Sequence, residues 1–300
     1  MMDSAKRALL DRLIDDASLF PPAQLPMRQA LRAHARHNES AYAFIGGRFV
    51  LAASRIDEFT STRQDGAIDV SVILDAGSAG AKGDTVRADL HRVERLRALD
   101  GVTVGGLEIK LSAVVDAVEL RRVVMLVGEG FQSDVSVWYE LAYAGGWAGS
   151  LDDTLAALAF ARTETPDHVM LGAKIRCGGA VVPSVDDVAA FIVAAHRHRV
   201  PWKATAGLHH PVRGGNAHGF LNLFVAGCAL NAEVLPEDRV AAVVAEEDAR
   251  NFVVDPTHVA WRDAQMDADA VAAGRGHCVA FGSCSFDEPV NDLRALGILS

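Results

Sequence analysis

Short apolar runs alternate with longer amphipathic segments over most of the chain. Runs rich in valine and isoleucine predict β-strands at 41–45, 68–75, 103–111, 135–141, 169–177, 201–205 and 278–282, with a further strand near 251–254. Apolar positions spaced by three and four predict helices at 84–99, 151–162 and 184–199. Ser184, followed three residues later by Asp187, is a capping-box signal for the start of the last of these helices.

This alternation requires a mainly parallel sheet with helical crossovers, because a tight turn cannot join two parallel strands. About eight strands leave two architectures, a closed (β/α)8 barrel and an open doubly wound sheet. Charged residues stand near the carboxyl ends of four successive strands, at Glu108, Lys110, Glu140, Lys174, Arg176 and Lys203. Such strand ends form the catalytic mouth of a barrel, so the sequence predicts a (β/α)8 TIM barrel. No GxGxxG motif follows the first predicted strand, which disfavours a dinucleotide-binding fold.

The beginning of the chain departs from this alternation. Two helices are predicted there, joined by the motif LFPPAQLPM at 19–27, whose prolines fix an extended connector. No linker or repeat divides the remainder. We therefore expect one barrel domain over 1–300, with 1–40 as an N-terminal helical extension packed on it. The pattern leaves open whether the proline-rich connector covers the floor of the barrel or reaches over its mouth.

Composition narrows the classes of partner. The chain has 300 residues, half of them hydrophobic, and a formal net charge of -10, and no basic stripe with interleaved aromatics indicates nucleic-acid binding. The N-terminal segment carries acids where a signal peptide would be apolar, and no window is long and apolar enough for a membrane span. We expect a cytoplasmic protein with a small-molecule substrate and no membrane partner. Apolar residues on the outer helices would allow a homo-oligomer.

Two lysines carry the strongest chemical signal, because Lys174 and Lys203 occupy consecutive predicted strands joined by one helix. Two ammonium groups about 6 Å apart repel by about 3 kcal/mol at an effective dielectric near 20. That repulsion equals about two pKa units, enough to favour a neutral, nucleophilic amine that forms a Schiff base with a carbonyl compound. Glu108 and Glu140 are then candidates for the general acid and base. The alternative is that these residues form ordinary buried ion pairs.

Two polar loops supply further candidates. The turn after the last strand places Gly282, Ser283 and Ser285 ahead of a helix, an arrangement that binds phosphate or another anion, with Arg176 and Arg213 as compensating cations. The loop GLHHPVR carries His209 and His210, which we expect to hydrogen-bond substrate, as Lys110 and Arg176 would at the mouth.

We expect no metal and no cofactor. The four cysteines form no CxxC pair and are interpreted as reduced thiols, mostly in the core. Two other functions stay open. One is a metal-dependent barrel lyase or hydrolase that uses Glu108, Glu140 and His209 or His210 as ligands. The other is a non-catalytic barrel that binds a small ligand.

The order of these motifs resembles that of class I aldolases of the deoxyribose-phosphate aldolase type. KIRCGG, KATAGLHHPVR and FGSCSF match in order and spacing the two lysine strands and the phosphate turn of that family. GLEIKL and VSVWYEL resemble its two preceding strands, and FIGGRFVLAASRIDEF resembles an early one, so the likeness spans the chain from about residue 41 onward. Ile175, Arg176 and Cys177 depart from it, since they replace small hydroxylated residues.

The resemblance implies Lys174 as the Schiff-base lysine, Lys203 as the residue that perturbs it, and Glu108 in place of a proton-relaying aspartate. It also implies Gly282, Ser283 and Ser285 as anion binders. The sequence therefore predicts an aldolase-like lyase that forms a lysine Schiff base with a small anionic or phosphorylated carbonyl substrate.

Overall fold

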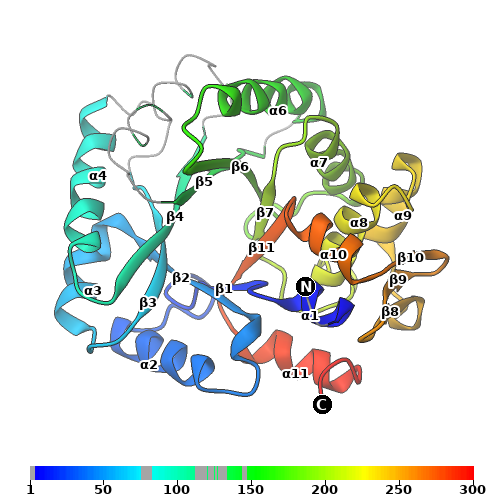
Figure 1. The fold of residues 1–300 in the computed structure, drawn as a ribbon, viewed down its shortest axis with the longest axis horizontal. Coiled ribbons are helices and arrows are strands. Elements are labelled where there is room, and N and C mark those ends of the chain that lie inside the picture. The colour runs from blue at the N-terminus through cyan, green and yellow to red at the C-terminus, as the bar shows by residue number, and fades with distance from the viewer. Residues whose placement is uncertain are drawn as a thin grey trace.

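Eight parallel strands close into a barrel, as the sequence predicts (Figure 1). The computed structural model describes residues 4–75, 83–111, 120, 125, 127, 134–143 and 147–300. Around the barrel the order is β1, β2, β3, β4, β5, β6, β7 and β11. These strands are Ile14–Asp16, Gly46–Ala52, Ile68–Ile73, Val102–Lys110, Val135–Glu140, Val169–Arg176, Trp202–Thr205 and Cys278–Ser283. The fold is therefore a (β/α)8 barrel.

Helices surround the barrel and connect its strands (Figure 1). They include α2 Met27–Asn38, α3 Ile56–Thr62, α4 Gly83–Arg97, α6 Trp147–Thr163, α7 Val185–Arg197, α8 Phe220–Asn231 and α11 Asp287–Ala295. The predicted capping box is present at α7, where Ser184 Oγ accepts from the Asp187 amide and the Asp187 carboxylate accepts from the Ser184 amide. Among the described residues, no helix has the length and apolar character needed to cross a membrane.

The N-terminal segment is part of the barrel, which corrects the prediction of 1–40 as an extension packed on it. It contains α1 Ala5–Leu10 and then β1, which pairs with both β11 and β2. β1 has three residues and two of them are aspartates, so it lacks the apolar run that marks a strand in a sequence. The strand predicted at 41–45 is instead a 3₁₀ turn, Ala43–Ile45, directly before β2.

A small antiparallel sheet lies beside the barrel, between α8 and β11 in the sequence. Its strands are β8 Phe252–Val254, β9 Val259–Trp261 and β10 Ala264–Met266, and α9 Val240–Ala245 precedes it while α10 Ala268–Arg275 follows. The strand predicted near 251–254 is therefore real but does not belong to the barrel.

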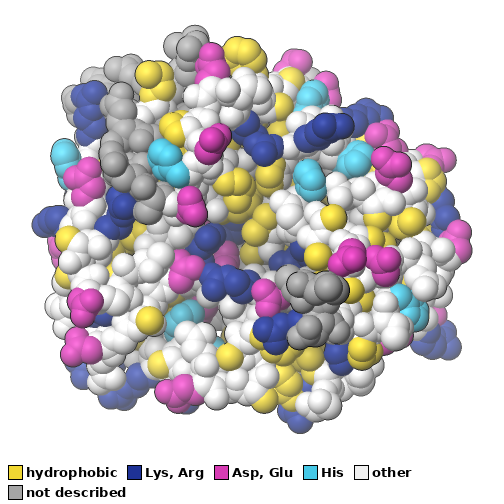
Figure 2. All heavy atoms as spheres, viewed as in Figure 1, with side chains coloured by type: hydrophobic (Ala, Val, Ile, Leu, Met, Phe, Trp, Pro, Cys, Tyr) yellow, Lys and Arg dark blue, Asp and Glu magenta, His cyan; other side chains and the backbone are white. Residues whose placement is uncertain are grey.

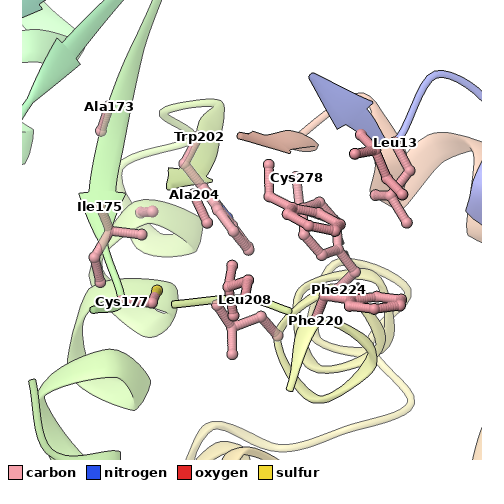
Figure 3. Close-up of a cluster of buried hydrophobic side chains, with 14 of the residues drawn as sticks. Leu13, Ala173, Ile175, Cys177, Trp202, Ala204, Leu208, Phe220, Phe224 and Cys278 are labelled. Atoms are coloured by element: carbon pink, nitrogen blue, oxygen red, sulfur yellow. Dashed lines mark hydrogen bonds between the residues drawn. The ribbon is translucent and has the colours of Figure 1, made fainter. Parts of the chain in front are cut away.

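An apolar layer holds β6, β7 and β11 against α8, which is buried from Phe220 to Leu230. Figure 3 shows Trp202, Phe224 and Cys278 within this layer, and Ala173 and Ile175 along β6. The rings of Trp202 and Phe224 lie 5.4 Å apart. Because side chains alternate along a strand, Lys174 and Arg176 of β6 project to the opposite side, into the barrel.

Cys177, Cys228 and Cys278 are buried free thiols, as predicted, whereas Cys284 is half-buried. On the face seen in Figure 2, basic and acidic side chains drawn in colour are interspersed and do not form one basic stripe.

Candidate active site

A cavity of about 570 Å³ opens at the carboxyl ends of the barrel strands, within the size range of small-molecule sites. Its lining comes from β2, β3, β4, β5, β6, β7 and β11 and from the connectors that follow β1, β6, β7 and β11. Charged side chains form the inner wall, namely Glu108, Glu140, Lys174 and Lys203, with Lys110 and Arg176 further toward the mouth. The charged residues predicted at the ends of four strands thus line the same cavity.

Glu108 lies at the centre of the charged wall and contacts both lysines. Its Oε2 atom lies 2.6 Å from Lys174 Nζ, and its Oε1 atom lies 2.7 Å from Lys203 Nζ. Ser71 Oγ donates to the same Oε1 atom at 2.8 Å. One carboxylate therefore binds one ammonium group at each of its oxygens.

Each lysine has a second carboxylate partner. Lys174 Nζ lies 2.7 Å from Glu140 Oε2, and Lys203 Nζ lies 2.5 Å from Asp15 Oδ2. The other oxygen of Asp15 accepts from the Arg48 amide at 2.7 Å. The result is one chain of alternating charge, Asp15–Lys203–Glu108–Lys174–Glu140, which we call the ion-pair chain.

Strand register brings these residues together. Glu140, Lys174 and Lys203 are direct partners on β5, β6 and β7, so they project into the barrel at one level. Lys110 is the register partner of Glu140 on β4. The prediction that the two lysines are neighbours on adjacent strands is confirmed by this register.

The charges of the ion-pair chain hold one another in the ionised state. Burial disfavours the charged form of Glu108, but Lys174 and Lys203 outweigh it and hold its pKa far below the ordinary range. Burial also opposes ionisation of Glu140, and Lys174 and Arg176 overcome it and lower the pKa of that carboxyl. For Lys203, burial lowers the pKa, but Asp15 and Glu108 prevail and raise it.

This geometry corrects the repulsion argument made from the sequence. Lys174 and Lys203 are not two bare cations, because three carboxylates surround the two ammonium groups. The attraction from Glu108 alone acts on both amines at closer range than their mutual repulsion. Lys203 is thus stabilised as an ammonium, and any loss of charge at Lys174 requires a proton acceptor.

Arg176 and Lys110 are the least enclosed cations of the wall. The Arg176 side chain is 46% exposed, and its Nη1 atom lies 3.3 Å from Glu140 Oε1. Lys110 is exposed and lines the same cavity. These two side chains are the cations that an incoming anion meets first.

The turn after β11 meets the cavity only in part. Gly282 and Ser283 line it, and Cys284 does so as well. Ser283 Oγ donates to the Ser285 carbonyl, and Ser285 Oγ accepts from the Glu288 amide at the start of α11. Ser285 is outside the cavity lining and stabilises the beginning of the helix.

Of the three residues predicted as substrate-binding in the GLHHPVR loop, one lines the cavity and two do not. His209 lines the cavity and its Nδ1 atom lies 2.9 Å from Glu288 Oε2. His210 instead contacts Asp292 at 2.7 Å, and Arg213 lies 3.7 Å from Glu247, both away from the cavity lining. The geometry brings His209 to the candidate site and leaves the other two outside it.

Sequence reasoning missed Asp15, Ser71 and the role of the proline-rich connector. Phe20, Pro21 and Pro22 of that connector line the cavity, so the motif reaches over the mouth of the barrel. Asp15 was missed because β1 was not recognised as a strand. The pair Asp15–Asp16 inside an otherwise apolar run, LIDDASLF, is the signal that points to it.

The two carboxylates of the cavity wall form ion pairs with lysines. Glu108 and Glu140 hold the ammonium groups, and His209 contacts Glu288. Within the described ranges, no group of three or more His, Cys, Asp or Glu side chains is arranged to hold a metal ion. The metal-dependent alternative therefore lacks a ligand set in that part of the chain.

Comparison with known proteins assigns the chain to no family. No protein-family model matches the sequence, and no curated protein matches it significantly. The fold and the cavity define a (β/α)8 barrel with a lysine–carboxylate site. The resemblance to class I aldolases therefore bears on function as a hypothesis.

Proposed function

We propose that the protein is a Schiff-base lyase that acts on a small anionic carbonyl compound, with Lys174 as the reacting amine. The observation that carries this proposal is the placement of Lys174 between Glu108 and Glu140 on the wall of the cavity. An amine that forms an iminium with substrate needs a neighbouring group that takes its proton and returns one. Two carboxylate oxygens within 2.7 Å of Nζ meet that need.

Lys174 is favoured over Lys203 because its partners differ. Both carboxylates that hold Lys203 are deeply buried, with side-chain exposures of 5% for Asp15 and 3% for Glu108. Glu140, the second partner of Lys174, also forms an ion pair with Arg176. A proton transferred from Lys174 to Glu140 reaches a carboxylate that also contacts the half-exposed Arg176, whereas among the described residues neither carboxylate partner of Lys203 has such a contact.

The first half of the reaction joins enzyme and substrate. Lys174 transfers a proton to Glu140, and the neutral amine attacks the carbonyl carbon to form a carbinolamine. The carbonyl oxygen takes one proton from the attacking nitrogen and one from Glu140 and leaves as water, which gives an iminium ion on Nζ and returns Glu140 to its ionised form. While the Lys174 amine is neutral, Lys203 stays cationic and keeps Glu108 ionised.

The second half breaks a carbon–carbon bond. A carboxylate accepts the proton of a hydroxyl group two carbons from the iminium carbon, and an aldehyde leaves. The electron pair of the broken bond moves into the iminium and forms an enamine. The enamine carbon then takes a proton, and water hydrolyses the resulting iminium, which frees the second product and Lys174. Glu108 suits the role of base because its ionised carboxylate lies 2.6 Å from Nζ, the atom that carries the iminium.

Reductive trapping tests this proposal. The protein is incubated with a panel of aldehydes, keto acids and sugar phosphates, treated with borohydride, digested and mapped by mass spectrometry. We expect a substrate-derived mass on the peptide that contains Lys174, and none in Lys174→Met. Lys6, a partly exposed lysine on α1, provides the control variant Lys6→Met, which should still be trapped. Absence of any adduct at Lys174 across the panel would contradict the proposal.

A non-catalytic role has one observation in its favour, which is the complete pairing of the two ammonium groups in the resting protein. In such a barrel, Arg176 and Lys110 bind an anion and the ion-pair chain only supports the wall. Lys174→Met then weakens ligand binding, and borohydride leaves no adduct on the wild-type protein.

A further inference from the structure

A second cavity lies away from the barrel mouth, between α2 and the segment that runs from the end of α3 to the start of β3. Its volume is about 510 Å³, and its lining residues are distinct from those of the candidate active site. We call it the arginine groove after four of its lining residues, Arg28, Arg32, Arg36 and Arg63. Such a volume is in the range that binds a nucleotide-sized molecule.

Three of these arginines form one row on α2. Arg28, Arg32 and Arg36 are spaced by four residues, so they lie one above another on the same helix face. At 1.5 Å per residue, their Cα atoms span about 12 Å along the helix axis. Like charges at this spacing destabilise a helix by about 0.2–0.5 kcal/mol per pair. The row therefore costs stability unless an anion lies against it.

The chain supplies little negative charge to offset the row. Among the residues that the structure describes, Arg28, Arg32 and Arg36 form no ion pair. Asp65 is the one carboxylate that lines the groove, against four arginines. This excess of positive charge is local, since the whole chain carries a formal charge of -10.

The opposite wall holds its arginine in a fixed position. Arg63 Nη2 donates to the Gly66 carbonyl at 3.1 Å and to the Asp100 carbonyl at 2.9 Å. Both acceptors are neutral carbonyl oxygens, so these two contacts bring no negative charge to the guanidinium. A ligand in the groove thus meets cations from both walls, and the one on the Arg63 side is already immobilised.

A buried histidine lies in the inner wall. His34 is 6% exposed, lines the groove, and contacts Asp16 Oδ2 through Nδ1 at 3.1 Å. Within the described chain, its Nε2 atom has no hydrogen-bond partner, so this nitrogen is available to a molecule in the groove. A histidine whose Nδ1 atom contacts a buried carboxylate is suited to donate a hydrogen bond from Nε2 to an anion.

From these features we infer that the arginine groove is a binding site for a small molecule with two or more phosphate groups. Guanidinium groups bind phosphate through paired N–H donors, and their charge does not depend on pH in the neutral range. A row of about 12 Å exceeds the reach of one phosphate and fits several anionic groups in line. The small-molecule size of the groove and the negative net charge of the chain disfavour a nucleic-acid chain.

Calorimetric titration of the full-length protein tests this inference. The probes are inorganic triphosphate, ATP, inorganic phosphate and a single-stranded oligonucleotide. We expect saturable binding of triphosphate or ATP, and binding of inorganic phosphate that is weaker by about tenfold or more. Tight triphosphate binding with weak ATP binding assigns the site to inorganic polyphosphates, and the reverse assigns it to nucleotides.

Two variants distinguish binding in the groove from non-specific attraction of anions to arginines on the surface. Arg32→Ala should weaken binding of the tighter probe by about tenfold, because one charged hydrogen-bond donor is lost. Arg95→Ala on α4 removes the same charge at a site outside the groove and should bind like the wild type. Equal affinity in wild type and Arg32→Ala, no saturable triphosphate or ATP binding, or binding of the oligonucleotide alone would overturn the inference.

Discussion

Lys203 Nζ lies 2.5 Å from Asp15 Oδ2, although β11 separates the two strands that carry these residues. The residue of β11 beside Asp15 is Gly282, which contributes no side chain between them. The ion pair spans a whole strand and fixes Lys203 at the β1 side of the cavity. Lys174, held from the β5 side by Glu140, is the amine nearer to Arg176.

Removal of Asp15 should destabilise the fold. Asp15→Ala leaves Lys203 buried with one carboxylate instead of two, and breaking a buried ion pair costs about 3 kcal/mol or more. Urea denaturation followed by circular dichroism measures the loss. Asp65→Ala removes an exposed carboxylate and should change the free energy of unfolding by less than about 0.5 kcal/mol. Equal stability of Asp15→Ala and the wild type would show that the pair contributes nothing.

Glu108→Gln should separate the role of the carboxylate from that of the lysines. The variant keeps the shape of the side chain but removes the negative charge between Lys174 and Lys203, so only Asp15 and Glu140 still offset the repulsion between the two ammonium groups. We expect a less stable protein in which borohydride trapping at Lys174 extends to lower pH than in the wild type. Trapping with an unchanged pH profile would mean that Glu108 does not control the charge of the reacting amine.

Stability should have a broad plateau in pH, with losses at both ends. The pKa of Glu108 is lowered in the folded protein, so its contribution is present above its ordinary value of 4.5 and is lost as the pH falls toward the folded value. The pKa of Lys203 is raised, so its contribution is present below 10.5 and is lost as the pH rises through the folded value. Urea midpoints measured from acid to alkaline pH test this. Lys203→Met should lose the alkaline dependence contributed by Lys203, and an unchanged alkaline arm would count against the assignment.

Arg176→Ala should affect binding of an anionic substrate more than turnover of bound substrate. The side chain is half-exposed and reaches the cavity beyond Glu140, so its loss removes a cation that an anion contacts before the reaction begins. We expect KM to rise by about tenfold or more with a smaller change in kcat, once a substrate has been found by trapping. A loss confined to kcat would place Arg176 in the chemical step instead.

The barrel and the adjacent lysines could be predicted from the sequence, because both follow from the order and period of apolar strands. Lys174 and Lys203 each sit near the end of a strand, and one helix connects them, which fixes them as neighbours in a parallel sheet. The bounds predicted for β3 to β7 lie within two residues of those observed.

Asp15 could not be found in the same way. β1 is three residues long and owes its place to pairing with β2 and β11, which are distant in sequence from each other. The pairing of Glu108 with both lysines also depends on how far side chains reach across the barrel interior, which strand order does not specify. For this reason the sequence suggested two repelling amines, whereas the structure has a chain of alternating charges.

Native-state reductive methylation tests most directly which amine reacts. Formaldehyde with cyanoborohydride forms and traps an iminium on any neutral, accessible lysine, and peptide mapping gives a separate rate for each position as the pH is varied. The account predicts that Lys174 is methylated many times faster than Lys203 in the folded protein, and that the two become equal on unfolding in urea. Faster methylation of Lys203, or equal rates at both lysines in the folded protein, would contradict it.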